Sequence, residues 1–118
     1  MSHRIFNMSF QSVFQALISK AERKGRTKQE VMEVTSWLTG YSVEDIEKLF
    51  ASEISYGDFF RLVPHYTVYR TNITGKICGV QIEAIEDPIM QEIRRLDKLV
   101  DWLAKGKTVE DIIGKYEG

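Results

Sequence analysis

The chain has 118 residues, of which 43% are hydrophobic, 28% charged and 11% aromatic, a composition that excludes disordered, collagen-like and membrane-embedded classes. With 16 basic and 17 acidic residues the net charge is -1, so no global field attracts nucleic acid or anionic lipid. One cysteine allows no internal disulfide and no apolar run reaches the length of a membrane span, which together predict a single cytoplasmic domain over residues 1–118.

Four helices are predicted in the first half of the chain from the helical spacing of apolar residues. The first covers residues 9–24. The second opens with a capping box between Thr27 and Glu30, in which each side chain bonds to the backbone N–H of the other residue. The third is short, and the fourth is a single turn that carries Phe59 and Phe60. The residues that begin or end these segments are Gly25, Gly40, Ser42 and Ser55.

The second half begins with an irregular stretch and one short strand. Helical periodicity is lost from Pro64 to Thr74. Cys78, Val80 and Ile82 then alternate with glycine and polar residues, which is typical of a half-buried strand. This alternation predicts that the Cys78 thiol faces the core, as an inert packed side chain.

A long helix is predicted over residues 88–105. Asp87 is a strong N-cap acceptor, and Pro88 has no N–H to lose at the first helical position. A last helix follows a Thr108 cap. Glu92 and Asp97 lie near the edges of the apolar stripe of the long helix, where each carboxylate is expected to need an arginine partner.

These elements together predict a mainly α fold of the α+β class. We expect five to six helices in a compact orthogonal bundle, with a short β-strand or hairpin near residues 76–83. Residues 3–7 are a candidate partner for that strand.

No motif assigns a chemistry to the chain. The Gly75 and Gly106 segments both fail the spacing of a phosphate-binding loop. One cysteine and two scattered histidines give no pair at metal-ligand spacing, so we expect no metal and no cofactor. The basic turn at residues 20–28 resembles a DNA-binding helix-turn-helix, but the helix after it carries Glu30 and Glu33 and no arginine or asparagine to read bases.

A small-molecule site is expected, if one exists, where residues 65–70 meet the strand and the N-terminal His-Arg pair. The candidate ligand-binding residues are His3, Arg4, Arg70, Lys76, Cys78 and Asp97. Because packing, capping and surface pairing account for each reactive-looking residue, the preferred interpretation is a non-catalytic protein-interaction module that self-associates through residues 88–105. A small enzyme or ligand-binding protein is the alternative, and a nucleic-acid-binding protein is the least favoured.

Several long segments are similar to a family of small bacterial proteins known as domain of unknown function 2200. The segments are His3 to Phe6 with Met8, "KAERKGRTKQEV", "WLTGY" and "ITGKICGVQIEAIEDPIMQEIRRLDKLVDWLAKGK". The resemblance implies a mainly helical, single-domain bacterial cytosolic protein and implies no activity. The chain departs from the family pattern at Phe14 and Gln81, where related chains have Tyr and Arg.

Overall fold

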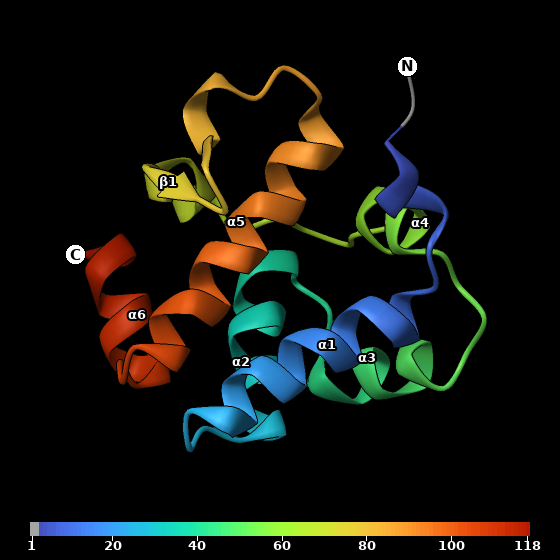
Figure 1. Ribbon diagram of the computed structural model, residues 1–118, viewed down its shortest axis with the longest axis horizontal. Helices are drawn as coiled ribbons and strands as arrows, with labels where there is room; N and C mark the ends of the chain where they lie inside the picture. The colour runs from blue at the N-terminus through green and yellow to red at the C-terminus, as the bar shows by residue number, and fades with distance from the viewer. Residues whose placement is uncertain (1–2) are drawn as a thin grey trace.

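The computed structural model describes residues 3–118, and the part of the chain that it describes contains six α-helices and one β-hairpin (Figure 1). The α-helices are α1 (Phe10–Arg23), α2 (Lys28–Thr39), α3 (Val43–Phe50), α4 (Tyr56–Arg61), α5 (Pro88–Ala104) and α6 (Val109–Glu117). The 3-10 helices are η1 (Arg4–Asn7), η2 (Val68–Asn72) and η3 (Ile82–Ala84). The Cα radius of gyration is 13.2 Å, close to about 13.5 Å for one compact domain of this length. The predicted mainly α fold with a short hairpin is confirmed.

Side-chain caps explain where the helices begin. In the predicted capping box, Thr27 N donates to Glu30 Oε1 at 3.0 Å and Glu30 N donates to Thr27 Oγ1 at 3.1 Å. Asp87 Oδ1 accepts from the backbone N–H groups of Ile89 and Met90 at 2.9 and 3.0 Å. The other predicted caps are present at Ser42, Ser55 and Thr108.

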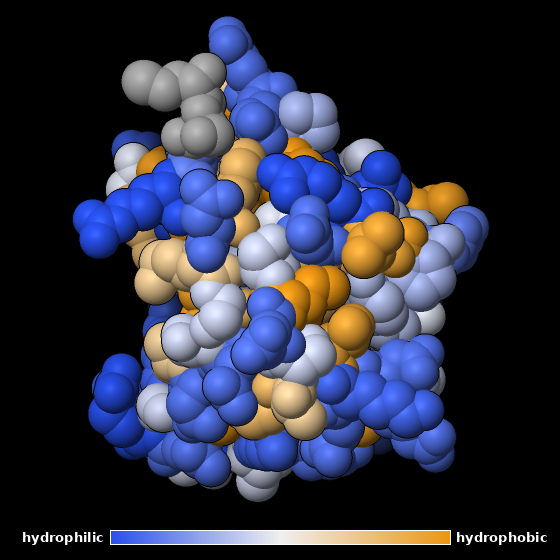
Figure 2. Space-filling view, turned by 90° about the vertical axis from the view of Figure 1, so that its right-hand side faces the viewer, coloured by the Kyte–Doolittle hydropathy of each residue, from blue (hydrophilic) through white to orange (hydrophobic). Residues whose placement is uncertain are grey.

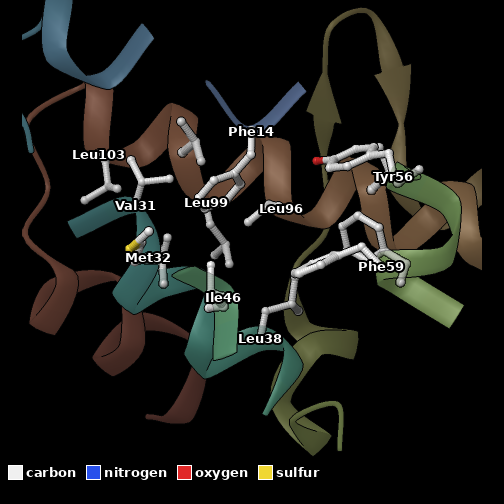
Figure 3. Close-up of a cluster of buried hydrophobic side chains, with 14 of the residues drawn as sticks. Phe14, Val31, Met32, Leu38, Ile46, Tyr56, Phe59, Leu96, Leu99 and Leu103 are labelled. Carbon is white, nitrogen blue, oxygen red and sulfur yellow. The ribbon is translucent and has the colours of Figure 1, made fainter. Parts of the chain in front are cut away.

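Helix α5 runs through the molecule, with α1, α2 and α4 packed against it and α6 folded back against α2 and the end of α5 (Figure 1). Side chains of α1 to α6 meet in one core, part of which is shown in Figure 3. Phe14, Leu38, Ile46, Phe59 and Leu96, one from each of α1 to α5, are all fully buried there.

The predicted apolar stripe of α5 is buried inside the monomer. Ile93, Leu96, Val100 and Leu103 are each 0% exposed. These four residues therefore offer no free apolar surface to a second copy, and self-association through residues 88–105 stays a prediction.

The segment after α4 crosses the C-terminal end of α2. The backbone N–H of His65 donates to Thr39 O at 3.2 Å, and that of Thr67 donates to Leu38 O at 3.1 Å. Gly40 has a φ of 78°, and a Cβ added there would lie 2.5 Å from the carbonyl oxygen of His65. Only glycine fits both the left-handed conformation and this close approach.

The N-terminal segment pairs with the start of α4 and not with the hairpin. Residues 4–7 form η1, which packs on α4. The backbone N–H of Tyr56 donates to Met8 O, and that of Phe10 donates to Ile54 O, both at 2.8 Å. Residues 3–7 were a candidate partner for the strand, and the structure contradicts that pairing.

The strand near residues 76–83 is a hairpin of β1 (Lys76–Ile77) and β2 (Val80–Gln81), and it pairs with itself. Cys78 and Gly79 form the turn, with φ values of 51° and 75°. Positive φ at both central residues is what a tight two-residue turn of this kind requires. Cys78 is consequently exposed at the tip, and the prediction that its thiol faces the core is wrong.

Figure 2 shows the face on the right of Figure 1, where hydrophilic residues predominate and hydrophobic residues form patches between them. Within residues 3–118, no helix has both the length and the apolar character needed to cross a membrane.

Candidate functional site

The last turns of α5 carry Trp102 between the hairpin and α6. Its indole Nε1 donates to the hydroxyl of Tyr116 at 2.9 Å, which fixes the ring against α6. The Tyr116 ring stacks in turn on Trp37 of α2, with 6.2 Å between ring centroids. The indole is thus held by Tyr116 of α6, which itself packs on α2, and is only half-buried.

Three lysine ammonium groups surround the Trp102 ring. The distances from Nζ to the ring centroid are 5.5 Å for Lys98, 5.4 Å for Lys105 and 5.0 Å for Lys115. Each distance suits a cation–π contact. Since each Nζ lies within 5.5 Å of the ring centroid, no two of the three charges are more than about 11 Å apart.

Carboxylates of the protein neutralise only some of the lysine charges near Trp102. Lys105 pairs with Asp101 at 3.0 Å, and Lys98 donates to the backbone carbonyl of Lys76 at 2.9 Å. Within the described chain, no carboxylate lies in ion-pair range of Lys107 or Lys115. The region is therefore a positive surface built around an aromatic ring.

Two hollows meet at this surface. One, of about 430 Å³, is lined by Trp102, Lys107, Asp111, Ile112 and Lys115. The other, of about 340 Å³, shares Trp102 and Lys115 and is also lined by Asn72, Thr74, Lys98, Tyr116 and Gly118. Both volumes are within the usual range for small-molecule sites. We call the two hollows with Trp102 and its lysines the Trp102 site.

The structure places the six sequence-predicted site residues in several separate surroundings. His3 and Arg4 are exposed at the start of η1, and the His3 and Phe6 rings meet edge to face, 5.3 Å between centroids. Cys78 is exposed at the hairpin tip, and Lys76 contributes its carbonyl oxygen to Lys98. None of these four residues lines either hollow of the Trp102 site, which instead includes Asn72 and Thr74, between the 65–70 stretch and the strand.

The remaining two predicted residues, Arg70 and Asp97, belong to two separate ion pairs, each with a residue of α5. Arg70 Nε lies 2.7 Å from Glu92 Oε2, and Arg94 Nη1 lies 3.1 Å from Asp97 Oδ2. Both carboxylates at the edge of the α5 stripe therefore have the arginine partner that the sequence predicted.

Away from the Trp102 site, Tyr56 and Asp97 form a buried polar group where α4 meets α5. The Tyr56 hydroxyl is fully buried without a hydrogen-bond partner in the described chain, and its oxygen is visible in Figure 3. Burial raises the pKa of Tyr56 well above its ordinary value, with the Asp97 carboxylate adding to the rise and Arg94 opposing it. Burial also raises the pKa of Asp97, although Arg94 and Lys20 both oppose this.

Asp101 lies one turn further along α5, and its pKa is lowered instead of raised. Burial alone would raise the pKa of Asp101, but hydrogen bonds and charge from Lys105 and Lys20 outweigh it and lower the pKa. Lys20 Nζ lies 3.3 Å from Asp101 Oδ1. Asp101 is thus held ionised at the border of the Trp102 site.

The sequence interpretation missed the Trp102 site. Lys98, Trp102 and Lys105 have the i−4, i, i+3 spacing that places residues on one helical face, and this signal was available. The contribution of Lys115 depends on how α6 folds back onto α5, which no local pattern encodes.

Comparisons with known proteins identify relatives without an assigned activity. A family described as "Uncharacterized protein conserved in bacteria (DUF2200)" matches residues 4–114. A solved structure described as "Crystal structure of uncharacterized protein SP1917" is 58% identical, with a TM-score of 0.97 over 100% of this chain and 97% of that chain. No curated protein matches the chain. The similarity covers α1 to α5 and most of α6, including Trp102.

Proposed function

The chain belongs to the DUF2200 family of uncharacterized bacterial proteins, and on that premise we propose that it is a binding protein whose Trp102 site holds a small anionic ligand. The observation that carries this proposal is the convergence of three lysine ammonium groups on one tryptophan ring beside two hollows. These lysines together would attract a bound anion. Binding would therefore be linked to both charge and salt concentration.

The proposal takes up the ligand-binding alternative in preference to the interaction module. Ammonium groups attract an anion, and the flat indole beside them can orient the uncharged part of its ligand. We also place the protein in the cytoplasm, because a reducing compartment keeps an exposed thiol such as that of Cys78 free.

Trp102 fluorescence tests the proposal directly. Trp37→Phe leaves Trp102 as the sole tryptophan, and this variant is titrated with sodium phosphate and sodium pyrophosphate against sodium chloride of equal ionic strength. We expect saturable changes with the phosphates that weaken as salt is added. Lys115→Met should weaken binding about tenfold or more, since a charge-assisted hydrogen bond contributes roughly 1.5–3 kcal/mol.

Lys24→Met is the matched control, because Lys24 is an exposed lysine next to the end of α1 and outside both hollows. It should bind as the parent does. A titration without saturation, or one in which Lys115→Met and Lys24→Met behave alike, would contradict the proposed function.

A further inference from the structure

We propose that the ligand of the Trp102 site is a phosphate monoester of a polyhydroxylated, sugar-type compound, an inference that rests on the proposed anion-binding function. The phosphate would lie between Lys107 and Lys115, and the hydroxyl groups would face Asn72 and Thr74. The Trp102 ring would lie between these two parts of the ligand.

The charge of the site fits a phosphate monoester. Four lysines contribute to the two hollows or to the Trp102 ring. Lys105 is paired with Asp101, and Lys98 acts on the Glu83 carboxylate, so Lys107 and Lys115 are the two positive charges left for a ligand. A phosphate monoester carries about −1.5 to −2 at neutral pH and a single carboxylate carries about −1. No arginine lines either hollow, and lysines act as point-charge phosphate binders, whereas paired recognition of carboxylates is typical of arginine.

Asp111 lies in the first hollow and is already engaged in helix capping. Its Oδ2 accepts from the backbone N–H of Thr108 at 3.3 Å, and its own N–H donates to Thr108 Oγ1 at 3.0 Å. The carboxylate is therefore turned to the N-terminus of α6. Lys107 and Lys115 remain in that hollow as the cations without an ion-pair partner in the described chain.

The second hollow offers neutral hydrogen-bonding groups. Asn72 Nδ2 donates to the carbonyl oxygen of Tyr116 at 2.8 Å, which orients the amide. Within the described chain no donor reaches Asn72 Oδ1, and Thr74 Oγ1 makes no hydrogen bond. A free amide oxygen and a free hydroxyl match the donor and acceptor capacity of sugar hydroxyls. The Trp102 ring adds an apolar surface for the C–H groups of such a compound.

The test titrates the Trp37→Phe protein with ribose 5-phosphate, glucose 6-phosphate, inorganic phosphate, pyrophosphate and ribose. We expect at least one sugar phosphate to bind tenfold or more tightly than inorganic phosphate, and ribose not to bind detectably. Thr74→Val should weaken sugar phosphate binding severalfold and leave phosphate binding unchanged, while Thr74→Ser should keep parental affinity. Circular dichroism confirms that each variant retains its helices.

The outcomes separate this inference from the proposed function. If phosphate or pyrophosphate binds as tightly as both sugar phosphates, and Thr74→Val changes nothing, the sugar phosphate inference is overturned. In that case anion binding that still depends on Lys115 leaves the proposed function standing. If no anion binds in a way that depends on Lys115, both are overturned.

Discussion

Arg70 Nε donates to Glu92 Oε2 at 2.7 Å and thereby ties η2 to α5. Arg95 Nη1 donates to the other oxygen, Glu92 Oε1, at 2.6 Å. The Glu92 residue is only 5% exposed, so one buried carboxylate holds two guanidinium groups. The Arg70 guanidinium also lies over the Tyr66 ring, 5.0 Å from its centroid. The Glu92 carboxylate thus helps to hold the irregular 64–74 segment in place on α5.

Glu92→Gln should destabilise the protein by about 3 kcal/mol, because removing one partner of a buried ion pair leaves the other charge uncompensated. Arg95 is most affected, since it is itself only 8% exposed. Urea denaturation of the variant and the parent gives the difference in free energy of unfolding. Glu53→Gln, at an exposed loop position, is the control and should stay within about 0.5 kcal/mol of the parent. Equal effects of the two substitutions would show that the Glu92 network contributes little.

Gly40→Ala should cost clearly more stability than Gly25→Ala. Both glycines have positive φ, 78° and 81°, so each alanine pays a conformational penalty of about 1–2 kcal/mol. At Gly25 nothing lies within 4 Å of an added Cβ, whereas at Gly40 the His65 carbonyl oxygen lies 2.5 Å away. We expect an additional loss of about 1–3 kcal/mol at Gly40 from this overlap. Thermal unfolding of the pair measures the difference, and identical losses would place the 65–67 segment further from α2 than the structure has it.

The protein should lose stability in alkaline solution as its buried tyrosines ionise. Burial raises the pKa of Tyr41 from 10.0 to about 12, with the Asp45 charge adding to the rise. A raised folded-state pKa means that the contribution is fully present below pH 10 and is lost as the pH rises through about 12. Tyr41→Phe should flatten this part of the stability curve.

At neutral pH the same Tyr41→Phe substitution should cost about 1 kcal/mol, because the Tyr41 hydroxyl donates to Phe59 O at 2.7 Å. Urea midpoints at pH 7 and pH 11 for the parent and the variant test both effects. The prediction fails if the two proteins keep a constant stability difference across that range.

Asp97 and Asp101 should titrate in a fixed order, although they are one helical turn apart. Burial raises the pKa of Asp97 above its ordinary 3.8, so its contribution to stability is present below that pH and is lost as the pH rises through the folded-state pKa. The pKa of Asp101 is lowered because Lys105 and Lys20 outweigh burial, so its contribution is present above 3.8 and is lost as the pH falls through the folded-state value. Carboxyl carbon NMR titration should find Asp97 titrating at the higher pH, and the reverse order would refute the burial argument.

Local signals predicted the helices well, because caps and apolar spacing act within a few residues. The capping box at Thr27 and the Asp87 cap before Pro88 both appear as predicted. The arginine partners of Glu92 and Asp97 followed from the cost of burying a lone carboxylate.

At the hairpin, local signals led to a wrong prediction for Cys78. The alternation of Cys78 with Val80 indicated one strand, but the Cys-Gly pair is the turn between two strands of two residues each. A residue followed by glycine between apolar residues is also a turn signal, and it competes with alternation over so short a run. The contribution of Lys115 to the Trp102 site was out of reach for a different reason, since Lys115 joins Lys98 only through the packing of α6 on α5.

The packing of α1 against α5 has a consequence for synthesis of the protein. These helices come from opposite ends of the chain, and four other elements separate them before the hairpin begins. Contacts between such distant segments close large loops and form slowly. During translation, α1 to α4 leave the ribosome before α5, so the parts of their apolar faces that α5 covers stay exposed until it emerges. The nascent chain therefore exposes apolar surface at this stage that the completed protein buries.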